Sequence, residues 1–110
     1  MTTQASLIAV ALLGALPACG SAVPAATPDA TTVLIKEFLF TPQSLQVAAG
    51  ATVTWKNLDD EPHTVRSANG SIRSGALDQN DTFSVTFKHP GVYAYGCSIH
   101  PRMAGTIVVK

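Results

Sequence analysis

The sequence has no excess of charge of either sign. Its 110 residues are enough for one domain, and they include seven basic and seven acidic side chains, so the formal net charge is zero with the three histidines neutral. Nucleic-acid-binding proteins depend on clustered Lys and Arg side chains to neutralise phosphates. The chain lacks that electrostatic footprint, and we expect no nucleic-acid partner.

Charge is absent altogether from the first 28 residues. Within them, residues 7–16 form a run of ten uncharged and mostly apolar residues, which matches a signal-peptide core and is too short to span a bilayer. The LPAC sequence that ends at Cys19 resembles a lipobox, where bacterial lipoproteins are cleaved and acylated on the cysteine. Ordinary signal cleavage near Ala22 or Ala26 is the alternative. Both routes predict a periplasmic or otherwise extracytoplasmic protein, and a lipid on Cys19 would attach it to a membrane.

Cysteine is scarce as well. Because Cys19 belongs to the leader, the mature domain would contain Cys97 as its single thiol. A lone thiol in an oxidising compartment is prone to oxidation or cross-linking unless something occupies it. A disulfide between the two cysteines is conceivable, but Cys19 lies in a segment rich in Ala and Pro, so Cys97 calls for another role.

No segment shows helical periodicity over more than one turn. Short runs of branched and aromatic residues follow one another instead, separated by turn residues. The predicted strands are residues 32–40, 44–48, 51–56, 63–67, 82–88, 92–97 and 104–110, with one more short strand near residues 71–74. Seven or eight short strands indicate an all-β fold, an antiparallel β-sandwich. The chain then divides into a leader with the start of a tether (1–26), a linker (27–31) and one β domain (32–110).

The residues that can bind a metal gather around the last loop. Cys97, His100 and Met103 lie within seven residues between two predicted strands, and His63 follows Pro62 at the start of another strand, 34 residues before Cys97. Neighbouring strand ends in a sandwich can bring His63 beside this loop. Two other features have plain interpretations, because His89 lies in a turn without a partner and the acidic run at residues 59–61 is typical of a solvated loop face.

This set of donor atoms favours copper. A thiolate and two imidazoles in a plane, with a weak axial thioether, is the arrangement of electron-transfer copper sites. Zinc would accept His63, Cys97 and His100, but it gains little from a thioether. Met103 therefore favours copper over zinc. Taken singly, Met103 could fill the core, Cys97 could be a buried structural thiol, and both histidines could lie on the surface.

The segment from residue 33 to 110 resembles the cupredoxins, most closely their amicyanin- and plastocyanin-like branch. The matching segments are FLFTP (38–42), GATVTWKN (50–57), PHTV (62–65) and GVYAYGC (91–97). Two residues between His100 and Met103 match the short ligand loop of amicyanin. The resemblance implies a Greek-key β-sandwich of seven to eight strands. It also implies one copper ion at one end, bound by His63, Cys97, His100 and Met103, with His100 at the solvent edge.

A type 1, or blue, copper site of this kind predicts electron transport. All four ligand positions are filled and no acid–base or nucleophile–base pair lies near them in the sequence, so we do not expect an enzyme. The expected partners are a redox protein donor and acceptor, such as a cytochrome, a dehydrogenase or a reductase. A periplasmic copper carrier or storage module without a redox role is the alternative. Nothing in the sequence indicates an obligate oligomer, and we expect a monomer.

Two residues depart from the family pattern. Thr64 stands where cupredoxins usually have Asn, whose side chain ties the two ligand loops together, so the tie must be different here. Ile99 stands where amicyanin has Pro, and it retains a backbone N–H. The N–H groups of Thr64 and Ile99 could both donate to the Cys97 sulfur, and bonds of this kind tune the potential of a bound metal.

Overall fold

The computed structural model describes residues 31–110, so the predicted leader and nearly all of the predicted linker lie outside the described residues. Seven strands follow one another along the described chain, and no helix is found among residues 32–110. The strands are β1 (Thr32–Lys36), β2 (Leu39–Thr41), β3 (Ser44–Val47), β4 (Ala51–Asn57), β5 (Thr82–Phe87), β6 (Gly91–Gly96) and β7 (Ala104–Val109). Within residues 31–110, no helix has the length and apolar character needed to cross a membrane.

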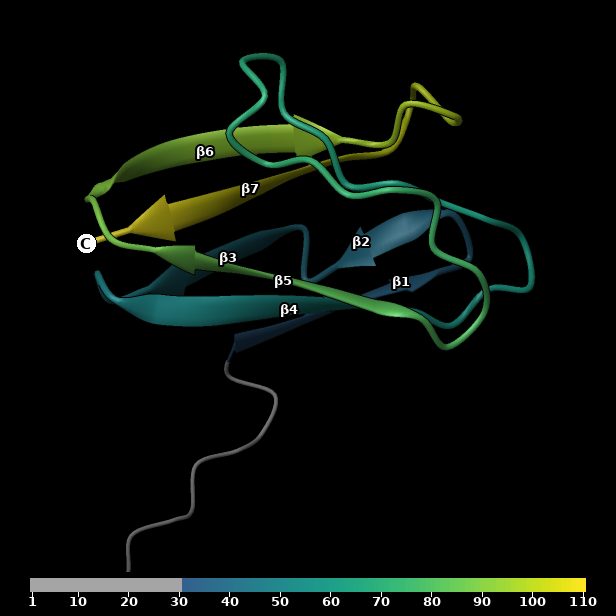
Figure 1. Ribbon diagram of the computed structural model, residues 1–110, viewed down its shortest axis with the longest axis horizontal. Helices are drawn as coiled ribbons and strands as arrows, with labels where there is room; N and C mark the ends of the chain where they lie inside the picture. The colour runs from purple at the N-terminus through teal and green to yellow at the C-terminus, as the bar shows by residue number, and fades with distance from the viewer. Residues whose placement is uncertain (1–30) are drawn as a thin grey trace, which may run out of the picture.

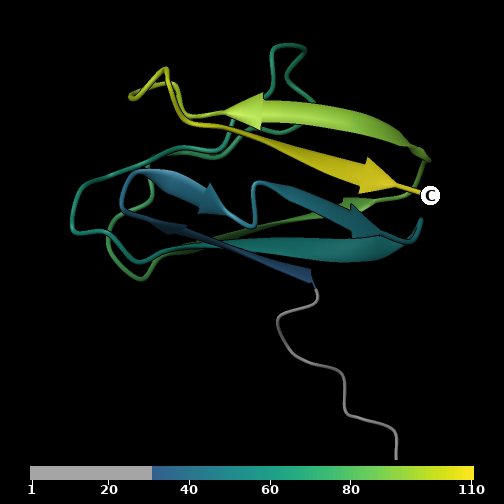
Figure 2. The same ribbon diagram turned by 180° about the vertical axis from the view of Figure 1, so that it is seen from behind.

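The strands form two sheets that face each other, and this confirms the predicted all-β sandwich (Figures 1 and 2). One sheet has the order β2-β1-β4-β5 and the other the order β3-β7-β6. The expectation of a purely antiparallel sandwich is wrong, because β1 runs parallel to β4 and β3 runs parallel to β7. The alternation of apolar and polar residues reports which face of a strand is buried and carries no information on strand direction.

The predicted strand at residues 32–40 is two strands joined by a tight turn. Lys36 pairs with Leu39 across this turn, and its two central residues, Glu37 and Phe38, have φ angles of 54° and 59°. Two-residue hairpin turns with positive φ are usually made by Asn and Gly. Because neither residue is present here, the sequence reads as one uninterrupted strand, and the turn must be stabilised by contacts from elsewhere.

The segments predicted as strands at residues 63–67 and 71–74 make isolated bridges instead. These bridges are His63–Leu77, Arg66–Arg73 and Arg66–Gly96. The N–H of Val65 is bonded to the Ser74 hydroxyl at 2.8 Å and not to a carbonyl. Because the partners change every few residues, no continuous ladder forms. The backbone groups of this segment nonetheless have hydrogen-bond partners. The segment places His63 at the end of the sandwich.

Apolar side chains from both sheets fill the space between them. Val53 and Trp55, which the sequence places on one face of β4, are both fully buried. Tyr95 lies at the centre of an aromatic group, with its ring 4.7 Å from Phe40 and 5.3 Å from Trp55 between centroids. The loop between β6 and β7 extends beyond this core at the end of the sandwich opposite the C-terminus (Figure 1).

Gly105 is required by the position of the Tyr95 ring. The two residues pair across β6 and β7, and a Cβ atom on Gly105 would overlap the Tyr95 phenol. The rings of Phe40 and Trp55 pack against that ring. We expect Gly105→Ala to lower the free energy of unfolding by about 1–3 kcal/mol, as overpacked cores do.

Urea unfolding of the metal-free protein measures this effect. Gly75→Ala is the matched control, because nothing lies within 4 Å of the added Cβ. Equal losses of stability in the two variants would contradict the assigned packing.

Candidate metal centre

Three of the four predicted ligands converge at one end of the sandwich. One donor atom from each of His63, Cys97 and His100 lies within 4.8 Å of the others. The Cys97 Sγ is 3.9 Å from Nδ1 of His63 and 3.7 Å from Nδ1 of His100. Cys97 directly follows β6, and His100 lies in the turn between β6 and β7. His63 comes from the bridged segment after β4, as the sequence leads one to expect.

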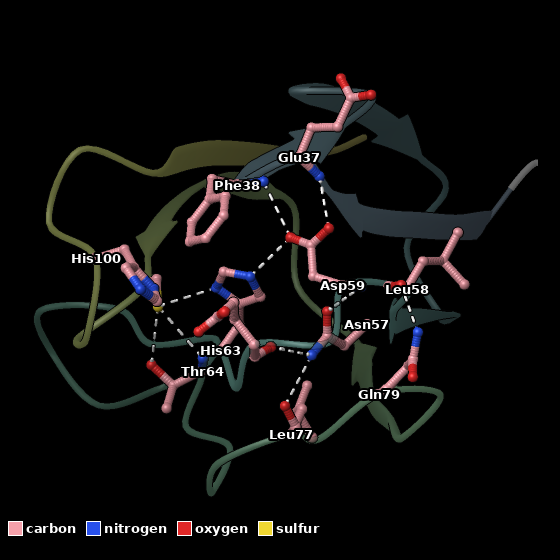
Figure 3. A network of polar contacts seen from close by, with 12 residues as sticks. Glu37, Phe38, Asn57, Leu58, Asp59, His63, Thr64, Leu77, Gln79 and His100 are labelled. Carbon is pink, nitrogen blue, oxygen red and sulfur yellow. Dashed lines mark hydrogen bonds and ion pairs between the residues drawn. The ribbon is translucent and has the colours of Figure 1, made fainter.

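Asp59 orients the ring of His63. Its carboxylate accepts a hydrogen bond from Nε2 of His63 at 2.8 Å, and the His63 side chain is fully buried (Figure 3). An Nε2–H donor leaves the lone pair of Nδ1 free, and Nδ1 is the atom that faces Cys97. The interpretation of residues 59–61 as a solvated face is therefore wrong for Asp59. Three consecutive acidic residues look alike in the sequence, and only the fold turns one of them inward.

Two further bonds hold the Asp59 carboxylate in place. It accepts the backbone N–H of Glu37 at 2.7 Å and that of Phe38 at 3.0 Å (Figure 3). Burial acts to raise the pKa of Asp59, but these two N–H groups and His63 hold that pKa below its ordinary value. The carboxylate thus stays ionised and remains an acceptor for the His63 ring.

Asn57 fixes the loop that carries Asp59. Its side chain is fully buried and donates to the carbonyls of Glu61 at 2.9 Å and Leu77 at 2.8 Å. Its side-chain oxygen accepts the N–H of Asp59 at 2.9 Å. Since a buried amide is costly unless its hydrogen-bonding groups are satisfied, this set of bonds defines one conformation of the loop.

The Cys97 thiol is prepared for binding a metal. It is a free cysteine and only 5% exposed. Burial acts to raise its pKa, but the Thr64 N–H, the nearby rings of His63 and His100, and the Ile99 N–H outweigh burial and lower the pKa to about 6. The thiolate is the form that binds metals. These groups around the Cys97 sulfur agree with the expectation that the backbone N–H groups of Thr64 and Ile99 interact with it.

Thr64 ties the two ligand segments together in place of the usual Asn. Its buried hydroxyl accepts the Ser98 N–H at 2.8 Å and shares a hydrogen bond with the Ser98 hydroxyl at 2.9 Å. The same hydroxyl is 3.7 Å from the Cys97 Sγ, and the Thr64 N–H is 3.4 Å from it. A side chain shorter than Asn therefore makes the tie and also reaches the sulfur.

Met103 and His100 differ in their exposure to solvent. Met103 is 4% exposed, and its N–H is bonded to the carbonyl of His100 at 3.0 Å. His100 is half-buried and borders a shallow hollow at the surface. The hollow is lined by Phe38, Ile99, His100, Pro101, Arg102 and Met103. His89, on the other hand, is exposed and takes no part in the cluster.

The spacing of the donors fits a metal ion in a trigonal plane. With a metal–sulfur bond of roughly 2.3 Å and a metal–nitrogen bond of roughly 2.0–2.1 Å, an angle near 120° separates sulfur and nitrogen by about 3.8 Å. The two observed separations of 3.7 and 3.9 Å bracket this value. Two imidazoles and one thiolate suit copper.

Comparison with known proteins agrees with this geometry. A family model described as a cupredoxin-like domain matches residues 6–109. The chain belongs to the cupredoxin family. Among related proteins, amicyanin-alpha of Methylorubrum extorquens is 36% identical over 96% of this chain and 94% of its own length. Amicyanin of Paracoccus denitrificans is 31% identical, with the same coverage of both chains.

Solved structures of cupredoxins superpose on the described domain. A reduced mutant of amicyanin matches 77% of this chain and 86% of its own, with a TM-score of 0.70 and 29% identity. A purple cupredoxin from Nitrosopumilus maritimus matches 73% of this chain and 99% of its own, with a TM-score of 0.66 and 32% identity. The predicted family is thereby confirmed. The predicted cofactor, one copper ion, is confirmed by the family together with the His–Cys–His cluster of this cupredoxin.

Removal of the Thr64 hydroxyl should weaken the connection between the ligand segments. In Thr64→Val the Ser98 N–H loses its acceptor while the shape of the side chain is kept. We expect a loss of about 0.5–1.5 kcal/mol in the free energy of unfolding. Thr64→Ser retains the hydroxyl and is the control. Urea unfolding of the metal-free variants tests this, and a Val variant as stable as the parent would contradict it.

The lowered pKa of Cys97 should be visible in the metal-free protein. Ultraviolet absorbance of the thiolate should titrate with a midpoint near 6, well below the ordinary value of 9. Because the folded-state pKa is the lower one, Cys97 contributes stability that is complete above pH 9 and is lost as the pH falls towards 6. Cys97→Ser supplies the background from the tyrosines. A midpoint at or above 9 would contradict the assigned environment.

Proposed function

We propose that His63, Cys97, His100 and Met103 bind one copper ion, and that the protein uses it to pass single electrons between redox proteins outside the cytoplasm. The observation that carries this proposal is the convergence of two imidazoles and a buried thiol at the spacing of a trigonal site. Electron transport without catalysis is the activity of the family, and the chain is assigned to that function class accordingly. Nothing in the comparisons supports the alternative of a copper carrier without a redox role.

The fixed positions of the donors explain why the site suits electron transfer. A bound copper ion would supply a one-electron couple between Cu(I) and Cu(II). The protein's own contribution is to hold the ligands still while the charge changes. Asp59 fixes the His63 ring, and the Thr64 hydroxyl and backbone N–H groups fix Cys97, so little rearrangement is required when an electron arrives or leaves.

His100 is the side chain through which electrons would enter and leave. It is half-buried, whereas His63, Cys97 and Met103 are buried. Its ring borders the hollow at the end of the sandwich, where the exposed Phe38 and Ile99 offer an apolar surface to a partner. Such a surface releases water readily on contact. This arrangement brings a partner protein within a short distance of the copper site.

Export of the protein accounts for the uncharged leader. The proposal that the leader is a signal peptide, with either lipid attachment at Cys19 or ordinary cleavage, rests on its sequence alone. An electron carrier that works outside the cytoplasm requires such a signal. The intact mass of the mature native protein distinguishes an acylated Cys19 from an N-terminus near Ala22 or Ala26.

Addition of Cu(II) to the purified protein tests the proposed function directly. We expect binding of one ion, an intense visible absorption from charge transfer between thiolate and copper, and a reversible one-electron wave in voltammetry. Cys97→Ser should lose the colour because it lacks the thiolate. A colourless complex of the parent protein, or a complex without a reversible wave, would contradict the proposal.

Met103→Leu separates an axial ligand from a residue that only fills the core. Leucine keeps the apolar volume but removes the sulfur donor. Loss of that donor destabilises Cu(II) more than the less charged Cu(I), so we expect the colour to persist and the reduction potential to rise. Ile107→Leu, at a fully buried site in β7, is the control and should leave the potential unchanged. An unchanged potential in Met103→Leu would show that Met103 is not a ligand.

A further inference from the structure

The two histidines of the cluster are held in different ways. The ring of His63 has a polar neighbour at each nitrogen, with Asp59 at Nε2 and Cys97 at Nδ1. Within residues 31–110, the ring of His100 has a single polar partner, Cys97 at Nδ1. A histidine that binds a metal is normally oriented by a bond from its other nitrogen. His100 lacks this bond to the described protein, so something else must set the orientation of its ring.

The aromatic ring of Phe38 lies where it can set the orientation of the His100 ring. It meets His100 edge-on, with a centroid distance of 4.9 Å and an interplanar angle of 85°. It meets His63 in the same way, at 5.2 Å and 85°. The two imidazoles are themselves 4.8 Å apart, so one benzene ring contacts both (Figure 3). Edge-to-face contacts of this kind are favourable and have a preferred geometry.

Burial in the core does not explain why Phe38 lies beside the two histidines. Its side chain is 44% exposed, and the backbone at Glu37 and Phe38 adopts the left-handed conformation that residues other than Gly and Asn seldom take. Strain of this kind persists only where the surroundings enforce it, and it is concentrated at functional positions. The enforcing group is Asp59, whose carboxylate accepts both N–H groups of the turn and also the Nε2–H of His63.

We propose that Phe38 is a positioning residue for His100, and that Asp59 holds Phe38 in place by fixing the turn between β1 and β2. One carboxylate thus orients His63 directly, through a hydrogen bond, and His100 indirectly, through the Phe38 ring. The inference rests on the proposed ligand role of His100. Its consequence is that the exposed ligand keeps the orientation needed for copper without a hydrogen bond at Nε2.

The mobility of the His100 ring in the metal-free full chain tests this inference first. In Phe38→Ala, relaxation of the imidazole carbon and nitrogen signals should show a mobile His100 ring beside an unchanged His63 ring. Phe38→Tyr keeps the aromatic edge and should restore the order of His100. Leu39→Ala is the matched control, because Leu39 is 59% exposed on the same hairpin and does not line the hollow beside His100. An equally ordered His100 in Phe38→Ala would overturn the proposal, and so would equal effects of Phe38→Ala and Leu39→Ala.

Asp59→Ala tests the link between the turn and the ring. With both N–H groups of the turn left without their acceptor, the His100 ring should become as mobile as in Phe38→Ala, and the His63 ring should become mobile too. A His100 ring that stays ordered in Asp59→Ala would show that Phe38 does not depend on the carboxylate.

Copper release to a chelator of Cu(I) is the second measurement. Release from Phe38→Ala should be roughly two- to tenfold faster than from the parent, the range expected for loss of one aromatic edge contact. Release as slow as from the parent would show that Phe38 does not retain the ligand. The ring-mobility measurement uses protein without metal, so its outcome is independent of whether the parent binds copper. A parent that binds no copper would overturn the proposed function and leave the mobility result standing.

Discussion

The carboxylate of Asp59 is the group on which most of the metal centre depends. It accepts three hydrogen bonds, two from the strained turn between β1 and β2 and one from the His63 ring. Without the two hydrogen bonds from the turn, nothing would stabilise positive φ angles in a hairpin turn made of Glu and Phe. Without the third, the buried His63 would have no bond at Nε2 to select the atom that faces Cys97. Local backbone strain and ligand orientation are therefore consequences of the contacts of one carboxylate.

The Cys97 side of the site is organised on the same plan. The Thr64 hydroxyl and two backbone N–H groups surround the sulfur, and the register of β6 and β7 fixes where the loop between them begins and ends. The ligands thus come from two segments that are held in different ways: a loop fixed by the buried Asn57, and the loop between the paired strands β6 and β7. A site built in this way is formed before the metal arrives, and it suits an ion that must change charge without moving its ligands.

The sequence predicted the fold class well because the alternation of apolar and polar residues shows which side chains of a strand are buried. Val53 and Trp55 alternate with polar residues, and both are buried where the pattern places them. The cluster of Cys97 and His100 in one loop was equally visible, because residue type and spacing carry that signal. His63 was recognisable from its place after Pro62 at the start of a predicted strand and from the PHTV segment shared with cupredoxins. The axial role of Met103 stays a prediction.

Other features could not be predicted, for physical reasons. The direction in which β1 pairs with β4 leaves no trace in residue periodicity. The turn at Glu37 and Phe38 contains no turn-forming residue, since its stability comes from Asp59, 21 or more positions away in the chain. The role of Asp59 was missed because it also depends on long-range contacts. In the sequence, Asp59 cannot be told apart from its acidic neighbours Asp60 and Glu61, which are exposed. Long-range hydrogen bonds that rescue unfavourable local conformations become visible only when the chain is folded.

The most direct test of this account is a pair of crystal structures of the protein, one without metal and one with copper. The account predicts one copper ion on Nδ1 of His63, Sγ of Cys97 and Nδ1 of His100, with Met103 adjacent. The Asp59 bonds to His63 and to the turn should be the same in both structures. Copper bound through Nε2 of His63, or an Asp59 carboxylate that meets His63 only when copper is present, would contradict a centre organised in advance by that carboxylate.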